Sequence, residues 1–188
     1  MRNKEIPRQV WNSSLFFSVL ELSDKKYGKF RCMMCTDCCV FGDYNETPLI
    51  FYWEVETLRN KARSVGASID IEPYLSVEDA EGIFTYIYRW KIQGRCPFLL
   101  NGKCIIHEDK PLSCRIFPLI ADIESSRIYV SGRCRWVREH KELISPSSIP
   151  EVFDEFELAV KIIGMVSKFI EISKNNGWRI IIHGRKDA

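Results

Sequence analysis

The chain has 188 residues, of which 46% are hydrophobic and 28% are charged, and its formal net charge at pH 7 is +2. This length and apolar fraction support one ordinary domain with a hydrophobic core, and argue against a disordered chain, a collagen-like repeat or a coiled coil. The small net charge argues against binding of a polyanion by the whole surface. No apolar run approaches the ~20 residues of a membrane-spanning helix. The sequence therefore predicts one soluble domain over residues 1–188, with no membrane partner.

The predicted elements begin after a first cluster of cysteines. Apolar residues at helical spacing predict a helix over 54–65, which Gly66 ends. Runs rich in β-branched and aromatic residues predict strands over 82–90 and 128–130. The Asn101-Gly102 pair predicts a tight reversal with Cys96 on one side and Cys104 on the other.

The longest predicted element is a packing helix over 148–176. Ser148-Ile-Pro-Glu151 has the pattern of a capping box, and Asn176-Gly177 has the pattern of a helix end. The helix has a wide apolar face, formed by Val152, Phe153, Phe156, Ala159, Val160, Ile163, Val166, Phe169 and Ile170. This face either forms the core or contacts a protein partner, and the pattern favours the core. A strand is predicted over 178–183.

Eight cysteines are the main functional signal. The N-terminal apolar patch Leu15–Leu22 is short and ends in charge, unlike a secretory signal, so we expect a cytoplasmic protein. In a reducing compartment, clustered cysteines are more often metal ligands than disulfides or buried apolar residues. Cys32-Met-Met-Cys35-Thr-Asp-Cys38-Cys39 supplies four soft donors in eight positions. Because adjacent side chains diverge, the Cys38-Cys39 pair favours a polynuclear cluster or two separate sites over one mononuclear zinc site.

The remaining cysteines are Cys96, Cys104, Cys114 and Cys134. We expect the first three to lie in one neighbourhood with the N-terminal four, because shared ligation is the reason for such residues to converge. Cys134 is either a core thiol or a further ligand, and the arginines that flank it favour a ligand loop.

The order of these motifs resembles the cysteine-cluster proteins of the YkgJ type. The resemblance lies in Cys32-x-x-Cys35-x-x-Cys38-Cys39, Cys96-Pro-Phe-Leu, Gly-Lys-Cys104-Ile and Pro111-x-x-Cys114-Arg-x-Phe-Pro, and it covers residues 30–135. It implies a zinc- or iron-chelating domain over these residues. A related cysteine cluster, in the flagellin lysine N-methylase family, is associated with an iron–sulfur centre.

The sequence departs from the family pattern at two places. Thr36-Asp37 stands where the family usually has a glycine between the second and third cysteines, and this puts a turn with positive φ in question. His107 and Lys110 stand where members tend to have tyrosine and arginine. His107 is either an added nitrogen ligand or a cap of the turn before Pro111, and the cap is favoured.

Positive charge is concentrated in the same part of the chain. Between Arg89 and Arg138 there are ten Lys or Arg and four Asp or Glu. Cations reduce the free energy needed to bring thiolates together, and we expect Arg115, Arg133 and Arg135 to do so. The alternative is a nucleic-acid surface that uses Trp90, Phe98 and Trp136 for stacking. We rank it second because the thiolates already account for the charge.

These observations predict a small α+β domain, in which short strands and loops surround a cysteine-ligated metal centre and the long C-terminal helix packs across them. The first function hypothesis is a metal-binding protein with a structural or redox centre. A [4Fe–4S] cluster is favoured slightly over Zn²⁺, because adjacent cysteines and eight sulfurs suit a cluster. The alternatives are a zinc-stabilised RNA- or protein-interaction module, and a methyl-transfer or redox enzyme. No phosphate-binding loop, nucleophile elbow or dinucleotide fingerprint occurs, so no catalytic residue is assigned.

Overall fold

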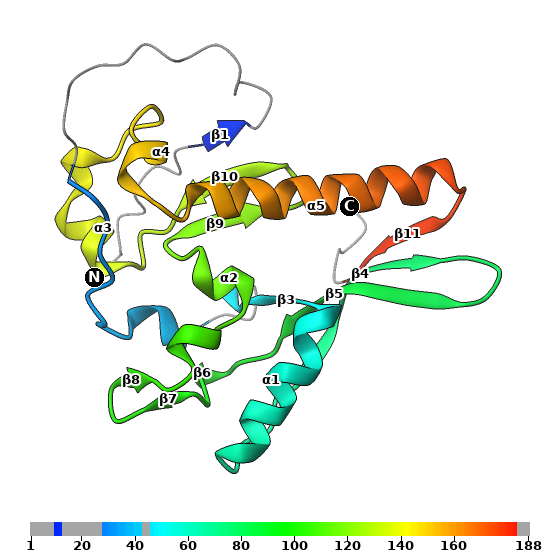
Figure 1. Ribbon diagram of the computed structural model, residues 1–188, viewed down its shortest axis with the longest axis horizontal. Helices are drawn as coiled ribbons and strands as arrows, with labels where there is room; N and C mark the ends of the chain where they lie inside the picture. Colours follow the sequence, from blue (N-terminus) through cyan, green and yellow to red (C-terminus); the bar gives the residue numbers. More distant parts are fainter. Residues whose placement is uncertain (1–9, 13–27, 43–45, 184–188) are drawn as a thin grey trace. The chain divides into compact units, whose positions relative to one another are not determined.

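The computed structural model describes residues 10–12, 28–42 and 46–183 (Figure 1). Within these ranges the chain mixes helices with antiparallel strands, as predicted. The described residues form two compact units. The first unit comprises those of Met1–Asp37 and Ile116–Ser167, and the second comprises those of Cys38–Arg115 and Lys168–Ala188. The metal-binding core over 30–135, within a single domain over 1–188, stays a prediction.

The second unit is built on a four-stranded antiparallel sheet in the order β11–β4–β5–β3. Its strands are β3 (Leu49–Phe51), β4 (Ile71–Glu78), β5 (Ile83–Trp90) and β11 (Arg179–Ile182). β4 and β5 form the long hairpin visible in Figure 1. β5 and β11 confirm the strands predicted over 82–90 and 178–183.

Helix α1 (Tyr52–Ser64) follows β3 directly and confirms the helix predicted over 54–65. Its buried residues Val55, Leu58 and Ala62 lie at helical spacing. They join a hydrophobic core made by Phe41, Ile50, Val55, Leu58, Ala62, Trp90, Ile92, Phe98 and Ile106. The helix ends as expected, because Gly66 adopts a φ of 70°.

Short elements, the first of which spans the boundary between the two units, carry or adjoin the cysteines of the second unit. They are the 3-10 turn η2 (Asp37–Cys39), β2 (Val40–Phe41), β6 (Gly94–Arg95), β7 (Leu99–Leu100), β8 (Lys103–Cys104), the 3-10 turn η4 (His107–Asp109) and α2 (Leu112–Arg115). The predicted reversal at Asn101-Gly102 is confirmed, since both residues have positive φ and connect β7 to β8.

The first unit contains a three-stranded antiparallel sheet in the order β1–β10–β9. The strands are β1 (Val10–Asn12), β9 (Leu119–Asp122) and β10 (Arg127–Val130), and β10 confirms the strand predicted over 128–130. The helical elements that follow are α3 (Arg135–Glu139), the 3-10 turn η5 (Lys141–Leu143), α4 (Ile149–Val152) and α5 (Phe156–Asn175), which continues from Ser167 into the second unit.

The single helix predicted over 148–176 is wrong in its first part. It divides into α4 and α5, because Phe153 takes an extended conformation with φ −113° and ψ 107°. The Phe153 side chain is fully buried and its ring contacts Phe30 and Trp136. The predicted capping box is also wrong, since the Ser148 hydroxyl donates to the carbonyl oxygens of Leu143 and Ser145 instead of capping α4.

Most of the apolar face predicted for this segment belongs to the core of the protein. Its buried members are Val152, Phe153, Phe156, Ala159, Ile163 and Val166. In the second unit, the ring of Phe169 stacks on Tyr86 of β5 with centroids 3.9 Å apart. Of the helices in the described ranges, none combines the length and the apolar character that a membrane span requires.

Candidate metal centre

All eight cysteines are free thiols that differ in exposure. Cys32 is exposed, Cys134 is buried with 6% of its surface accessible, and the other six are half-buried. The boundary between the two units falls within the N-terminal motif, between Asp37 and Cys38. The cysteines therefore form two groups. The five-cysteine group, in the second unit, is Cys38, Cys39, Cys96, Cys104 and Cys114, and the three-cysteine group, in the first unit, is Cys32, Cys35 and Cys134.

Strand pairing brings the adjacent cysteines to Cys96. The Sγ atoms of Cys38 and Cys39 lie 3.8 Å apart. The backbone N–H of Cys96 donates to the carbonyl oxygen of Cys39 over 2.8 Å. This contact continues the antiparallel pairing of β2 with β6, in which Val40 lies opposite Arg95. Two segments far apart in the sequence thus deliver three thiols to one place.

A hairpin brings Cys104 to the same side of the unit. β7 pairs with β8 so that Leu99 lies opposite Cys104, and the N–H of Leu99 donates to the carbonyl oxygen of Cys96 over 3.0 Å. Cys96 and Cys104 both pack against the hydrophobic core described above. The core therefore fixes these two positions in the absence of any disulfide between them.

Cys114 lies on α2, whose start is held by two neighbouring elements. The N–H of Leu112 donates to Glu54 Oε1 of α1 over 2.8 Å, and the Ser113 hydroxyl donates to the carbonyl oxygen of Leu49 over 2.6 Å. Glu54 Oε2 accepts from the N–H of Phe51 over 3.0 Å, so one carboxylate caps both α1 and α2. These bonds fix the position of the Cys114 side chain relative to the core.

The thiols of the five-cysteine group share one electrostatic environment. Burial raises the pKa of Cys114, and the charges of Cys96, Cys38 and Cys104 raise it further. Burial likewise raises the pKa of Cys96 to about 11, against the N–H of Phe98, which lowers it. Ionising several of these thiols together is therefore unfavourable unless positive charge is supplied.

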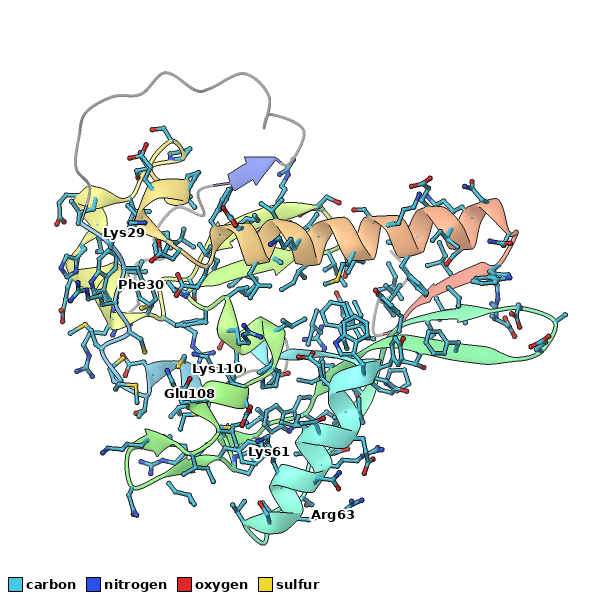
Figure 2. The ribbon with its side chains drawn as sticks, in the orientation of Figure 1. Lys29, Phe30, Lys61, Arg63, Glu108 and Lys110 are labelled. Carbon is cyan, nitrogen blue, oxygen red and sulfur yellow. The ribbon has the colours of Figure 1, made fainter. Side chains whose placement is uncertain are left out.

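The sequence prediction missed the cation that faces this group. The hydrogen bond with Cys39 raises the pKa of Cys38 and burial raises that of Cys114, and the charge of Lys110 partly offsets both rises. Lys110 follows η4, and the ion pair of Lys61 Nζ with Asp109 Oδ2, at 2.7 Å, ties that turn to α1. Figure 2 shows Lys61 on α1 and Lys110 beside the turn. The position of Lys110, four residues before Cys114 in the sequence, could have indicated a cation near this thiol.

In the first unit, the loop with Cys32 and Cys35 is anchored at its start by Phe30. The N–H of Phe30 donates to the carbonyl oxygen of Val152 over 2.8 Å. The ring of Phe30, which Figure 2 labels, meets Trp136 of α3 edge-on, with centroids 5.4 Å apart.

The same loop is anchored at its end by Asp37, which lies at the boundary of the unit. Arg138 Nη2 lies 2.8 Å from Asp37 Oδ2, and Arg135 Nη2 lies 3.5 Å from Oδ1. Arg133 Nη2 donates to the carbonyl oxygen of Asp37 over 3.2 Å. Arg133 and Arg135, the arginines predicted beside Cys134, thus hold the loop through Asp37. These contacts occupy part of the positive charge that the alternative hypothesis assigned to nucleic-acid binding.

Cys134 immediately precedes α3 and occupies its N-cap position. Burial raises the pKa of its thiol. The N–H groups of Val137 and Trp136 lower that pKa, because they point towards the sulfur from the first turn of α3. The charges of Cys35 and Cys32 raise it, as expected for three neighbouring thiolates.

The turn between the second and third cysteines does have positive φ, although no glycine is present. Thr36 has a φ of 66°, and Met34 has a φ of 53°. The left-handed region is unfavourable for a β-branched residue such as threonine. The contacts of Phe30 and Asp37 at the two ends of the loop hold this conformation.

Two predicted residues lie elsewhere in the second unit. His107 is half-buried at the start of η4, and its role as a ligand stays a prediction. Arg115 is exposed, and its charge partly offsets the rise in the pKa of Glu54 that burial causes. Because it acts on the carboxylate that caps α2, its charge bears on the position of Cys114.

Sulfur is the donor that suits both zinc and iron, and both groups offer it without competing disulfides. Across residues 10–12, 28–42 and 46–183, no set of three or more His, Cys, Asp or Glu side chains is already arranged around a metal position. The expectation that Cys32 and Cys35 share a neighbourhood with the cysteines of the second unit stays a prediction.

Comparison with known proteins gives one match. Residues 31–135 match the model of the CxxCxxCC family, which is described as "Putative zinc- or iron-chelating domain". The matched range begins just before Cys32 and ends just after Cys134, so it spans all eight cysteines. No curated protein and no solved structure matches the chain.

Proposed function

Because the chain belongs to the CxxCxxCC family of zinc- or iron-chelating domains, we propose that it is a metal-binding protein whose resident centre is held by the five-cysteine group. The observation that carries this proposal is the convergence of thiols from four separate segments of the second unit. Strand pairing, a hairpin and the short helix α2, held by hydrogen bonds to Glu54 and Leu49, bring them together without a disulfide.

The electrostatics of the group fit a metal cation. The hydrogen bond with Cys39 and burial raise the pKa of Cys38, and burial and neighbouring thiolates raise the pKa of Cys96 and Cys114. Lys110 only partly offsets these effects on Cys38 and Cys114. A metal ion would supply the positive charge that allows the thiolates to remain together. Folding of the second unit and metal binding are therefore coupled, and removal of the metal is expected to loosen its cysteine-bearing loops first.

The donor set is compatible with two resident groups. Cys38 and Cys39, with their Sγ atoms 3.8 Å apart, support the iron–sulfur cluster as the first candidate. Zn²⁺ is the second, since four thiolates satisfy its tetrahedral preference. A [4Fe–4S] cluster would supply one-electron redox chemistry when bound, whereas Zn²⁺ would supply a fixed positive charge that links the loops.

The experiment is anaerobic purification followed by measurement of iron, zinc and the visible absorption spectrum. We expect a metal that stays bound during exposure to EDTA, and we expect the Cys114→Ser variant to lose it. Leu100→Ser is the matched control, because Leu100 is exposed in the hairpin and offers no ligand. A wild-type protein without iron or zinc, or full metal content in Cys114→Ser, would contradict the proposal.

A further inference from the structure

We propose that the open edge of β5, over residues 83–86, binds an extended segment of another protein, which adds a strand to the four-stranded sheet of the second unit. The bound segment would have apolar or aromatic residues at alternate positions, and a Lys or Arg where it lies beside the turn between β4 and β5. This inference goes beyond the proposed function, because recognition of a partner at this edge does not depend on the metal centre.

The outer edge of β5 is paired along part of its length only. β3 is the neighbour of β5 on that side, and their pairing ends where Phe51 lies opposite Ile87. The chain then leaves the sheet, because α1 begins at Tyr52. Among the described residues, no strand pairs with the outer edge of β5 over residues 83–86, and Figure 1 shows this end of the hairpin projecting beyond β3.

The alternation of hydrogen bonds in an antiparallel pair directs backbone groups towards this edge. The N–H of Asp79 donates to the carbonyl oxygen of Gly82 over 3.0 Å, so these two residues face each other across the turn. The next residue of β5, Ile83, therefore directs its N–H and C=O away from β4, and so does Thr85. An extended peptide is able to bond to both residues, which is the way in which peptide-recognition domains add a strand to a sheet.

Exposed apolar side chains surround the same edge. The exposed fractions are 62% for Ile83, 47% for Tyr52, 46% for Phe84 and 42% for Trp53. The ring of Tyr52 meets that of Phe84 with centroids 5.2 Å apart and that of Trp53 with centroids 5.0 Å apart, both edge-on. Tyrosine and tryptophan contribute much of the binding energy of protein interfaces. Natural sheets protect an open edge with Lys, Pro or a bound partner, and residues 83–86 include neither Lys nor Pro.

The charge beside the edge favours one kind of partner. Glu78 pairs with Arg179, and the turn adds two further carboxylates, those of Asp79 and Glu81. This negative charge favours a Lys or Arg at the end of the bound segment that lies beside the turn. A second copy of the chain would bring an edge that has no charged residue over 83–86, so it would place no cation there. A different protein with a basic end to its strand is therefore the better fit.

The test is selection of a random peptide library, displayed on phage, against the anaerobically purified full chain. We expect the selected peptides to alternate apolar with polar residues and to carry Lys or Arg at one end. Ile83→Pro removes an N–H from the edge, and proline is tolerated at the first residue of a strand. We expect it to weaken binding of a selected peptide about tenfold in fluorescence polarisation. Ile83→Val, which keeps this N–H, is the matched control and is expected to bind within about twofold of the wild type.

Hydrogen exchange of the wild type tests the site without a substitution. A selected peptide is expected to slow exchange of the amides of Ile83 and Thr85 at least about tenfold, and to leave the β7–β8 hairpin unchanged. If circular dichroism shows that Ile83→Pro does not fold, Glu81→Lys takes its place, and we expect it to weaken binding of peptides with a basic end.

Three results would overturn the proposal. The first is a selection that enriches no family of peptides on the wild type. The second is protection from exchange at amides outside β5. The third is a wild type that sediments as a dimer and an Ile83→Pro variant that sediments as a folded monomer, which would place a second copy of the chain on this edge.

Discussion

Thr36, in the loop that carries Cys32 and Cys35, has an unfavourable backbone conformation. Its φ of 66° lies in the left-handed region, which L-residues enter at a free-energy cost of about 1–2 kcal/mol. Glycine avoids this cost but gives the unfolded chain more conformational freedom. The free-energy cost of the left-handed conformation at Thr36 is therefore slightly larger than the entropic cost of ordering a glycine at this position.

We expect Thr36→Gly to raise the free energy of unfolding by up to about 1 kcal/mol, because relief of strain outweighs the added entropy of the unfolded chain. Urea denaturation of the metal-loaded protein measures this change. Met33→Gly, at an exposed position of the same loop without positive φ, is the control and is expected to destabilise. Equal destabilisation by both substitutions would show that Thr36 is not strained.

At the scale of elements, Glu54 joins two helices that are distant in the sequence. Its two carboxylate oxygens accept N–H groups at the start of α1 and at the start of α2. Burial nevertheless raises the pKa of Glu54, against the lowering effects of the N–H groups of Phe51 and Leu112 and of the charge of Arg115. The position of Cys114 thus depends on a carboxyl group whose ionised form is disfavoured by burial.

This shift predicts a pH dependence of stability. The folded state holds the Glu54 proton more tightly than the unfolded chain, whose pKa is near 4.5. The contribution of protonated Glu54 to stability is therefore fully present below about pH 4.5, and it is lost as the pH rises through the higher pKa of Glu54 in the folded state. We expect the unfolding free energy of the wild type, relative to Glu54→Gln, to fall as the pH rises from 4.5. Urea denaturation of both proteins at a series of pH values measures it. A constant difference, or one that grows with pH, would contradict this account.

The sequence predicts most elements whose signal is local. The helix over 54–65, the Asn101-Gly102 turn and the strand over 82–90 each follow from spacing or residue type, and each is confirmed. β4 was missed because Pro73 lies inside it, and proline normally argues against a strand interior. The register shifts next to Pro73 show that the sheet accommodates it by an irregularity.

The break between α4 and α5 illustrates what local pattern does not predict. The apolar spacing continues through Phe153, so the sequence favours an uninterrupted helix. The extended conformation of Phe153 places its ring against Phe30 and Trp136, which are distant in the sequence. Tertiary packing therefore outweighs the helical pattern at this residue.

At the scale of the whole chain, the sequence predicted that cysteines form the candidate site, but it did not predict how they are grouped in the fold. The cysteine spacing identifies the ligand type, and the family match supports it. The grouping of Cys134 with Cys32 and Cys35 depends on the contacts of Phe30 and Asp37 with α3, which no spacing encodes. The effect of Lys110 likewise arises from the folded position of η4.

X-ray absorption spectroscopy at the iron and zinc edges of the anaerobically purified protein tests the central claim most directly. If the cysteines hold the resident metal, its nearest neighbours are sulfur atoms, at about 2.3 Å for zinc. We expect this sulfur shell in the wild type and its loss in Cys114→Ser. A metal surrounded by nitrogen and oxygen ligands at about 2.0–2.2 Å, with no sulfur shell, would contradict the account.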